Sequence, residues 1–344
     1  MHRTNGWIAA LVAAAVALTV SLVGAGASVG TPSPERVDAG PTVPTARTPV
    51  LDNRCKRSGL DVPACGVLWG LFTTSQDYGA VEKTIGRRFD IVKNYVDWQP
   101  GVTFPNGTDR RLAAGHRILD ISWNAVDYRT GAKISYQSIA SGQWDASVIR
   151  PEARALKHFH HRIFIDFNHE FDSRSQAGHG TPSQYAAAYR HIHDVFRLAG
   201  VHNVIWVWVT TSDRYHAKQL QAGYPGSRYV DWVGYDPYNF AQCHAWPWHS
   251  PYRTIYPYYR WLSHQPGMRH KPVMLGEYAS APGATIGTWY AGVAAALRRM
   301  PRIKAVMQFD HQTPTCDFRL QSNAGALTGF AASATSAYVL GTAG

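Results

Sequence analysis

The 344-residue chain is long enough for one large or two small domains, and its 45% hydrophobic content allows a substantial core. A formal charge of +11 could attract nucleic acid, but the Arg and Lys residues are scattered, without a long basic run or a recognisable binding motif. We therefore expect no nucleic-acid partner. An acidic polysaccharide stays an alternative substrate, and a generally basic secreted protein is the simpler interpretation.

The N-terminus has the pattern of an export signal. Residues 1–27 hold a short basic start, an apolar run over 8–23, and small residues at the cleavage position. The run is short for a membrane span, although an uncleaved anchor is the alternative. Residues 28–54 are rich in Pro and Thr and read as a linker. We expect a secreted, extracellular protein with no stable membrane span after cleavage and one domain over 55–344.

Four cysteines leave three disulfide connectivities open, and export makes disulfides plausible. We favour Cys55–Cys65, which lie close together before the first strand, and Cys243–Cys316, which both fall in late loops. No CxxC pair exists, so a metal site built from these residues is not expected. We expect neither metal nor cofactor.

Strand-like and helix-like segments alternate after the linker. The predicted strands are 66–74, 90–98, 117–124, 162–172, 204–211, 230–239, 272–278 and 304–310. The predicted helices are 81–89, 139–159, 181–198, 252–262, 288–300 and 324–339. Eight such units match a (β/α)8 TIM barrel. A doubly wound open sheet is the alternative, but no GxGxxG or GxxxxGK[ST] turn follows the first strand, which weakens its nucleotide-binding version.

The fourth strand alternates apolar and polar residues. Ile163 and Phe167 belong to the apolar row, and Asp166, Asn168 and Glu170 belong to the other. In a parallel barrel the outer face lies under helices, so the polar row faces the interior and Glu170 lies at the mouth.

The seventh strand, 272–278, also ends in a lone carboxylate, Glu277. Cleavage of a glycosidic bond requires two carboxyl groups, one to protonate the leaving oxygen and one to attack or to activate water. Carboxylates that end two different barrel strands can supply such a pair.

Three motifs carry a family resemblance: Asn-His-Glu at 168–170, Gly-Glu-Tyr at 276–278, and the segment 224–238 that ends in Tyr-Asp-Pro-Tyr. Together they resemble glycoside hydrolase family 26, the secreted β-mannanase-like enzymes of the retaining barrel clan. The resemblance covers most of residues 66–340 in layout.

The resemblance implies roles residue by residue. Glu170 corresponds to the general acid/base and Glu277 to the nucleophile, with Tyr238, two residues after Asp236, as the tyrosine that hydrogen-bonds the nucleophile. The resemblance also places His169 at the site, which requires the strand to twist or bulge at its end. A retaining enzyme holds its two carboxyl groups about 5–5.5 Å apart. A phenol that donates to Glu277 favours its charged form and leaves the raised pKa on Glu170.

Other side chains are candidates for sugar contacts. Trp98, Trp208 and Trp246 could stack on sugar rings, with core packing as the alternative for the barrel tryptophans. Asn124 and Asn168 point inward by parity and could bind hydroxyl groups, or could satisfy one another.

Two departures from the family bear on the substrate, because neither 171–178 nor 308–311 contains the tryptophan that the family's mannanases have there. We predict a monomeric, secreted, retaining endo-β-glycoside hydrolase that acts on a β-linked polysaccharide, by default β-1,4-mannan. The alternatives are a hydrolase of another β-glucan or of xylan, and a non-catalytic glycan-binding barrel of the cell envelope.

Overall fold

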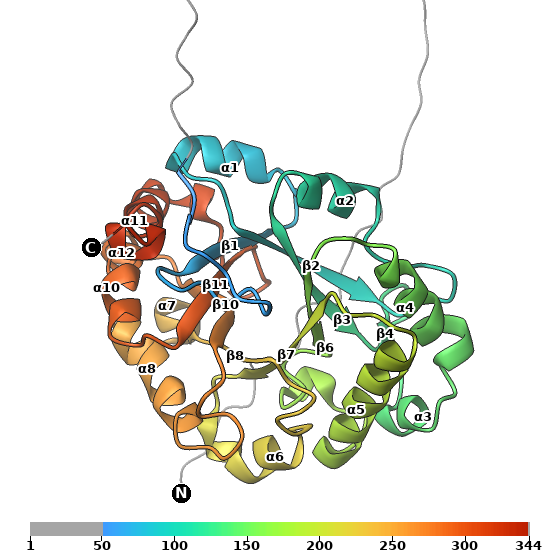
Figure 1. Ribbon diagram of the computed structural model, residues 1–344. Helices are drawn as coiled ribbons and strands as arrows, with labels where there is room; N and C mark the ends of the chain where they lie inside the picture. The colour runs from blue at the N-terminus through green and yellow to red at the C-terminus, as the bar shows by residue number, and fades with distance from the viewer. Residues whose placement is uncertain (1–50, 343–344) are drawn as a thin grey trace, which may run out of the picture.

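The computed structural model describes residues 51–342 of the chain. The expected signal peptide and residues 28–50 of the expected linker lie outside this range, so they stay predictions. The last linker residues pack on the domain, since the N–H of Arg88 donates to the carbonyl of Leu51 at 2.9 Å. Strands and helices then alternate and build a closed parallel barrel with a ring of helices around it (Figure 1). The predicted (β/α)8 barrel is confirmed.

The barrel closes because β11 pairs with both β1 and β10, and all eight neighbouring pairs are parallel. In sheet order the barrel strands are β1 (Leu68–Thr73), β2 (Ile91–Asp97), β3 (Ile118–Asn124), β6 (Ile163–Phe167), β7 (Val204–Thr211), β8 (Trp232–Asp236), β10 (Val273–Ser280) and β11 (Ile303–Asp310). Three two-residue strands are added: β9 (Tyr238–Asn239) beside β10, and β4 (Val126–Asp127) paired with β5 (Ala132–Lys133).

Helices cover the outside of the barrel (Figure 1). The α-helices are α1 (Tyr78–Ile85), α2 (Gly107–Ala114), α3 (Tyr136–Ala140), α4 (Arg150–Lys157), α5 (Pro182–Leu198), α6 (Ala217–Ala222), α7 (Ala241–His244), α8 (Pro251–Leu262), α9 (Ile286–Ala291), α10 (Val293–Arg298), α11 (Ala324–Ala334) and α12 (Ala337–Leu340). A π-helical turn, η1 (Asp145–Ile149), precedes α4, and short 3-10 turns lie at η2 (Arg174–Gln176), η3 (Arg214–His216) and η4 (Leu320–Ser322).

The helix predicted over 139–159 is wrong as a single element, because it divides into α3, the π-helical turn and α4. Gly142 takes a left-handed backbone at φ 82° between α3 and the turn, and this ends α3. The predicted start of α5 is confirmed. Thr181 accepts a hydrogen bond from the N–H of Gln184, whose side chain bonds back to the N–H of Thr181, and Pro182 is the first helical residue.

Two apolar layers hold the fold together. The larger one fills the space between the strands and the helices and includes Tyr185 and Tyr189 of α5. The hydroxyls of these two tyrosines donate to the carbonyls of Phe167 and Val207, which anchors α5 to β6 and β7. A second layer plugs the barrel interior at the end opposite the mouth. Its members are Leu68, Ile91, Ile118, Phe164, Ile205, Val207, Val209, Trp232, Met274, Ala305 and Met307.

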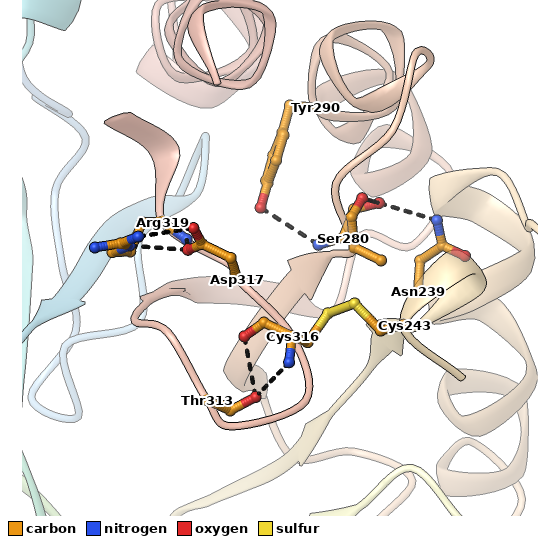
Figure 2. The surroundings of a disulfide bond; sticks show 9 residues. Asn239, Cys243, Ser280, Tyr290, Thr313, Cys316, Asp317 and Arg319 are labelled. Carbon is orange, nitrogen blue, oxygen red and sulfur yellow. Dashed lines mark hydrogen bonds and ion pairs between the residues drawn. A yellow bond between two sulfur atoms is a disulfide. The ribbon is translucent and has the colours of Figure 1, made fainter. Parts of the chain in front are cut away.

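The predicted disulfides are confirmed as Cys55–Cys65 and Cys243–Cys316. The second joins the short helix α7, and not a loop as predicted for Cys243, to the loop after β11, as Figure 2 shows. There the Thr313 hydroxyl donates to the carbonyl of Cys316 at 3.0 Å and accepts from its N–H at 2.9 Å, which fixes the turn that carries the sulfur.

Among residues 51–342, no helix is both long and apolar enough to cross a membrane.

Candidate active site

Glu170 lies just beyond β6, where the backbone leaves the extended conformation. Asn168 and Glu170 adopt left-handed backbones at φ 48° and 52°. Asparagine tolerates this conformation, whereas glutamate seldom adopts it. The strict alternation of the strand therefore stops after Phe167, and His169 turns into the mouth instead of outward. The resemblance required the strand to twist or bulge at its end if His169 is to reach the site, and the backbone does change direction there.

Asn168 fixes that turn through its own amide. Its oxygen accepts from the N–H of Ala125 at 3.0 Å, and its nitrogen donates to the Tyr136 hydroxyl at 2.6 Å and to Gln176 Oε1 at 2.9 Å. Both amide hydrogens are used, and the side chain is buried. The predicted contact of Asn168 with a sugar hydroxyl is therefore corrected to a structural role, which is to hold the segment that carries Glu170.

Glu277 lies near the end of β10, at a register shift of this strand against β11 that falls between Leu275 and Tyr278. Its N–H donates to Asp236 Oδ1 at 2.8 Å. Two tyrosines hydrogen-bond its carboxylate: the Tyr95 hydroxyl donates to Oε1 and the Tyr238 hydroxyl donates to Oε2. The predicted hydrogen bond from Tyr238 is thus present in the structure. Tyr95 was not predicted.

His169 bridges Glu277 and Asn124. Its Nε2 lies 3.4 Å from Glu277 Oε1, and its Nδ1 lies 3.3 Å from Asn124 Oδ1, so each ring nitrogen faces an acceptor. Burial alone lowers the pKa of His169, but its hydrogen bond with Glu277 and the charge of that carboxylate raise the pKa above its ordinary value. Asn124 in turn donates to the Tyr128 hydroxyl at 2.6 Å. Its amide therefore orients the imidazole.

The two glutamates have opposite electrostatics. Burial raises the pKa of Glu277, but the hydrogen bond and charge of His169, the charge of Lys93 and the hydrogen bond from Tyr238 together bring the pKa below its ordinary value. Burial and the charge of Glu277 raise the pKa of Glu170 to about 8. Near neutral pH, Glu277 is therefore an anion and Glu170 holds a proton. A general acid must hold a proton and a carboxylate nucleophile must be ionised, so these two states suit the two roles.

Asp236 lies between the two glutamates. Burial, then the charges of Glu277 and Glu170, raise its pKa well above the ordinary value. Its second oxygen, Oδ2, is buried and has no hydrogen-bond partner among the described residues. One ligand atom each from His169, Glu170 and Asp236 lie within 4.8 Å of one another, so these three groups have the spacing of cation ligands.

A second polar group, which we call the interior ion cluster, consists of Lys93, Asp120 and Asp166. The Lys93 ammonium lies 3.0 Å from Asp120 Oδ2 and 2.8 Å from Asp166 Oδ2, and all three side chains are buried. Burial lowers the pKa of Lys93, but the two carboxylates outweigh it and raise the pKa. Burial raises the pKa of Asp120 to about 6, although Lys93 opposes the shift. Sequence reasoning missed Lys93.

Three tryptophans were candidates for sugar stacking, and two of them are corrected. Trp98 and Trp208 belong to the layer between strands and helices and are only 1% and 0% exposed. Val207 and Val209 face the barrel interior, so the strand alternation sends Trp208 outward. Trp98 packs on Trp123 with ring centroids 4.7 Å apart. The third candidate, Trp246, is 43% exposed and can meet a ligand.

Tyr95 and Lys93 share a signal that could have revealed them. Both lie on β2, where Ile91, Lys93, Tyr95 and Asp97 occupy alternate positions. Ile91 belongs to the interior layer, so the same parity carries Lys93 and Tyr95 into the barrel. A lysine and a tyrosine at inward-facing positions of a strand indicate a polar site inside the barrel, as the carboxylates after and within β6 do.

A closed parallel barrel with two carboxyl groups of opposed pKa, Glu170 just after β6 and Glu277 near the end of β10, is typical of a barrel glycoside hydrolase. Residues 131–255 match the model of glycosyl hydrolase family 26. This match confirms the predicted resemblance to glycosyl hydrolase family 26 over that part of the chain.

Among curated proteins, the chain is similar to Endoglucanase H of Acetivibrio thermocellus, with 27% identity over 260 residues. The match covers 71% of this chain but only 27% of that protein. The chain therefore spans about a quarter of the length of this relative.

Solved structures show the same fold at lower identity. A family 26 β-mannanase from Bacteroides ovatus superposes with a TM-score of 0.61 at 15% identity, covering 79% of this chain and 89% of that one. The catalytic domain of an endo-β-1,4-mannanase from Bacillus sp. JAMB-750 gives 0.58 at 18% identity, with 79% and 86% covered. An endo-β-1,4-mannanase from Cellulomonas fimi gives 0.55 at 19%, with 79% and 71% covered.

Proposed function

We propose that this protein is a secreted, retaining endo-β-glycoside hydrolase in which Glu170 is the general acid/base and Glu277 is the nucleophile. The observation that carries the proposal is the opposed pKa of these two carboxyl groups, about 8 for Glu170 and below the ordinary value for Glu277. Asp236 also has a raised pKa, but its Oδ1 accepts from the N–H of Glu277, so we assign the acid role to Glu170.

The reaction follows from those charges. In the first step an oxygen of Glu277 bonds to the anomeric carbon, the bond from that carbon to the leaving oxygen breaks, and the proton of Glu170 moves to the leaving oxygen. In the second step Glu170, now a carboxylate, takes a proton from water. The water oxygen bonds to the anomeric carbon and Glu277 leaves as a carboxylate, so two inversions retain the configuration.

The substrate is a β-linked polysaccharide, and β-1,4-mannan is the first candidate because the sequence motifs resemble mannanase-like enzymes. A β-glucan is the second candidate, favoured by the similarity to a protein named as an endoglucanase. The fold likeness to solved mannanases does not decide between the two backbones, since identities below 20% define the fold alone.

The rim of the mouth can hold a chain longer than the cleaved unit. Trp246 and Trp248 lie on one loop and are 43% and 45% exposed. A path of rings links this loop to the nucleophile, because Tyr238 packs on Phe240 at 5.2 Å and Phe240 packs on Trp246 at 5.5 Å. A hollow of about 360 Å³ lies beside the Cys243–Cys316 disulfide and is lined by Gln and Thr side chains. Aromatic faces and polar hollows of this kind suit an extended sugar chain.

Export is part of the proposal. Two disulfides in one domain suit an oxidising, extracellular compartment, in keeping with a cleaved signal over 1–27, a linker over 28–54 and a barrel domain over 55–344. We expect the mature protein to act as a monomer.

The test is the release of reducing sugar from galactomannan, glucomannan, mixed-linkage β-glucan, β-1,3- and β-1,4-xylan and an acidic polymer. Wild type, Glu170→Ala and Glu277→Ala are compared, and the proposal expects one polymer to be cleaved by the wild type and by neither variant. Glu152→Gln is the matched control, because Glu152 is a buried glutamate of α4 outside the barrel interior, and its Oε2 accepts from the N–H of Phe104, a bond that the amide oxygen of glutamine can also accept.

The anomeric form of the first product, followed by NMR, separates the outcomes further. Retained configuration supports a covalent intermediate, whereas inversion contradicts the proposed role of Glu277. A wild type that binds one polymer and cleaves none would instead favour the non-catalytic glycan-binding barrel.

A further inference from the structure

We propose that Tyr95 is a second positioning residue for the nucleophile, which together with His169 holds Oε1 of Glu277 so that Oε2 is the oxygen that attacks the anomeric carbon. The inference rests on the proposed function of Glu277. It adds a residue that no motif indicated and names the reacting atom.

The donors around the Glu277 carboxylate are distributed unequally. Oε1 accepts from the Tyr95 hydroxyl and lies 3.4 Å from His169 Nε2, whereas among residues 51–342 Oε2 accepts only from the Tyr238 hydroxyl. An oxygen must lose hydrogen bonds as its lone pair becomes a covalent bond. Oε2 has one donor to lose and Oε1 has two, so attack through Oε2 disrupts less of the site.

The two phenols are also held differently. Tyr95 lies within the seven-residue strand β2, opposite Ser122 of β3, and its ring packs edge-on against Phe72 at 4.6 Å and tilted against His169 at 5.3 Å. Tyr238 belongs to the two-residue strand β9, and its ring packs on Phe240 at 5.2 Å and on Phe318 at 5.1 Å. Both rings are packed, so the difference lies in the backbone: a barrel strand carries Tyr95, whereas a short strand beside β10 carries Tyr238, the phenol that must change partner when Oε2 attacks.

The chemistry gives Tyr95 a role in both halves of the reaction. When Oε2 bonds to the anomeric carbon, Oε1 becomes the carbonyl oxygen of the ester and still accepts from Tyr95 and His169. When water displaces the ester, negative charge returns to the carboxylate and these donors stabilise it. Hydrogen bonds to a carboxylate make it a weaker nucleophile and a better leaving group, so Tyr95 accelerates the second step more than the first.

The kinetic test uses Tyr95→Phe with an aryl β-glycoside whose dinitrophenolate leaving group makes hydrolysis of the intermediate rate-limiting. We expect kcat to fall roughly 10- to 100-fold, the range set by a hydrogen bond to a charged group, with KM falling in parallel and kcat/KM within a few-fold of wild type. A burst of dinitrophenolate shows the accumulated intermediate. A loss confined to kcat/KM, with kcat and the burst unchanged, overturns the inference.

The structural test traps the intermediate of the wild type with a 2-deoxy-2-fluoro glycosyl donor and determines its crystal structure. The expected ester forms through the oxygen that faces Tyr238, with the Tyr95 hydroxyl still bonded to the other oxygen. An ester through the oxygen that faces Tyr95 overturns the assignment.

Tyr189→Phe is the matched control, because Tyr189 is a buried phenol of α5 whose hydroxyl donates to the carbonyl of Val207, away from the two glutamates. It should keep wild-type kcat and KM. Failure of the proposed function is distinguishable, since an inactive or inverting wild type refutes Glu277 as nucleophile, whereas an active, retaining wild type with an unaltered Tyr95→Phe variant refutes only the inference.

Discussion

Two groups of buried carboxyls share the interior of this barrel, and they differ in what compensates their charge. In the interior ion cluster, Asp120 and Asp166 both contact the Lys93 ammonium at 3.0 Å and 2.8 Å. At the mouth, the charge of Glu277 is met by phenols and an imidazole, and Glu170 stays neutral because its pKa is raised to about 8. No ammonium or guanidinium lies in an ion pair with either glutamate within residues 51–342.

This difference in compensation distinguishes carboxyl groups that stabilise the fold from carboxyl groups that can react. A buried lysine between two aspartates compensates their charge and holds their positions, so that removing it leaves uncompensated anions. Hydroxyl donors stabilise a carboxylate without neutralising it, so Glu277 keeps the lone pair that a nucleophile needs. The carboxyls of the cluster are therefore paired with a cation, whereas those at the mouth are free to exchange protons or form a bond during a reaction.

The largest expected effect comes from removing the proton at the mouth. Glu170→Gln should lower kcat/KM on the polysaccharide roughly 10²- to 10⁴-fold, because the amide cannot protonate the leaving oxygen. The wild type needs Glu170 protonated, so its kcat/KM should fall as pH rises through about 8. A pH–rate profile of kcat/KM on the polysaccharide should show this alkaline limb in the wild type and lack it in the variant. On a dinitrophenyl glycoside, which needs no acid in the first step, kcat/KM of the variant should stay close to that of the wild type. An alkaline limb that persists in the variant would assign the group to another residue.

Lys93→Met tests the other half of the comparison. It leaves Asp120 and Asp166 without a cation, so the free energy of unfolding at pH 7 should fall by about 3–5 kcal/mol. Without the cation, both carboxyls have higher pKa values in the folded than in the unfolded chain. The folded state therefore binds more protons, and the loss should shrink as pH falls toward the unfolded value of about 3.9.

Urea unfolding at pH 4.5 and pH 7 measures this difference. Lys304→Met on β11 is the matched control, because Lys304 lies in no ion pair within residues 51–342 and should show a small, pH-independent change. Equal losses at the two pH values for Lys93→Met would mean that packing, not charge, explains the effect.

The smallest expected effect is that of Asp120→Asn, which keeps Lys93 paired with Asp166. The pKa of Asp120 is about 6 in the folded protein and about 3.9 in an unfolded chain, so its ionisation reduces stability as pH rises between these values. The neutral amide should flatten that dependence and change the free energy of unfolding by no more than about 1 kcal/mol at pH 4.5. Chemical unfolding across pH 4–7 measures how the free energy of unfolding depends on pH. An unaltered pH–rate profile of the variant would show that Asp120 does not take part in catalysis.

Much of the fold could be predicted from strand periodicity. The polar row of β6 showed which face was interior, and Asp166 does face inward to Lys93. The apolar run of β10 placed Glu277 at a strand end. Helices were harder, because short outer helices interrupted by glycine lack a long apolar period. The helix α2 had a signal that was not used, a capping box in which Asn106 accepts from the N–H of Asp109.

The site was predicted in part. Alternation alone points His169 outward, and only the left-handed backbones of Asn168 and Glu170 turn it into the mouth. Alternation does place Lys93 inward, but its pairing with Asp120 depends on the register of β2 against β3, which sets the two directly opposite. Register is a tertiary property that one strand's sequence does not encode. Trp208 shows the converse error, since an aromatic side chain carries no mark of which face it occupies.

The left-handed backbone at Glu170 has a consequence for how a protein of this kind can evolve. A non-glycine residue in this conformation costs on the order of 1 kcal/mol. Glycine at position 170 would remove that cost together with a buried acid, so Glu170→Gly should unfold at a higher temperature than the active enzyme, as calorimetry can show. A lineage released from selection for hydrolysis would thus gain robustness by discarding its acid first, and would keep a barrel that still binds glycan.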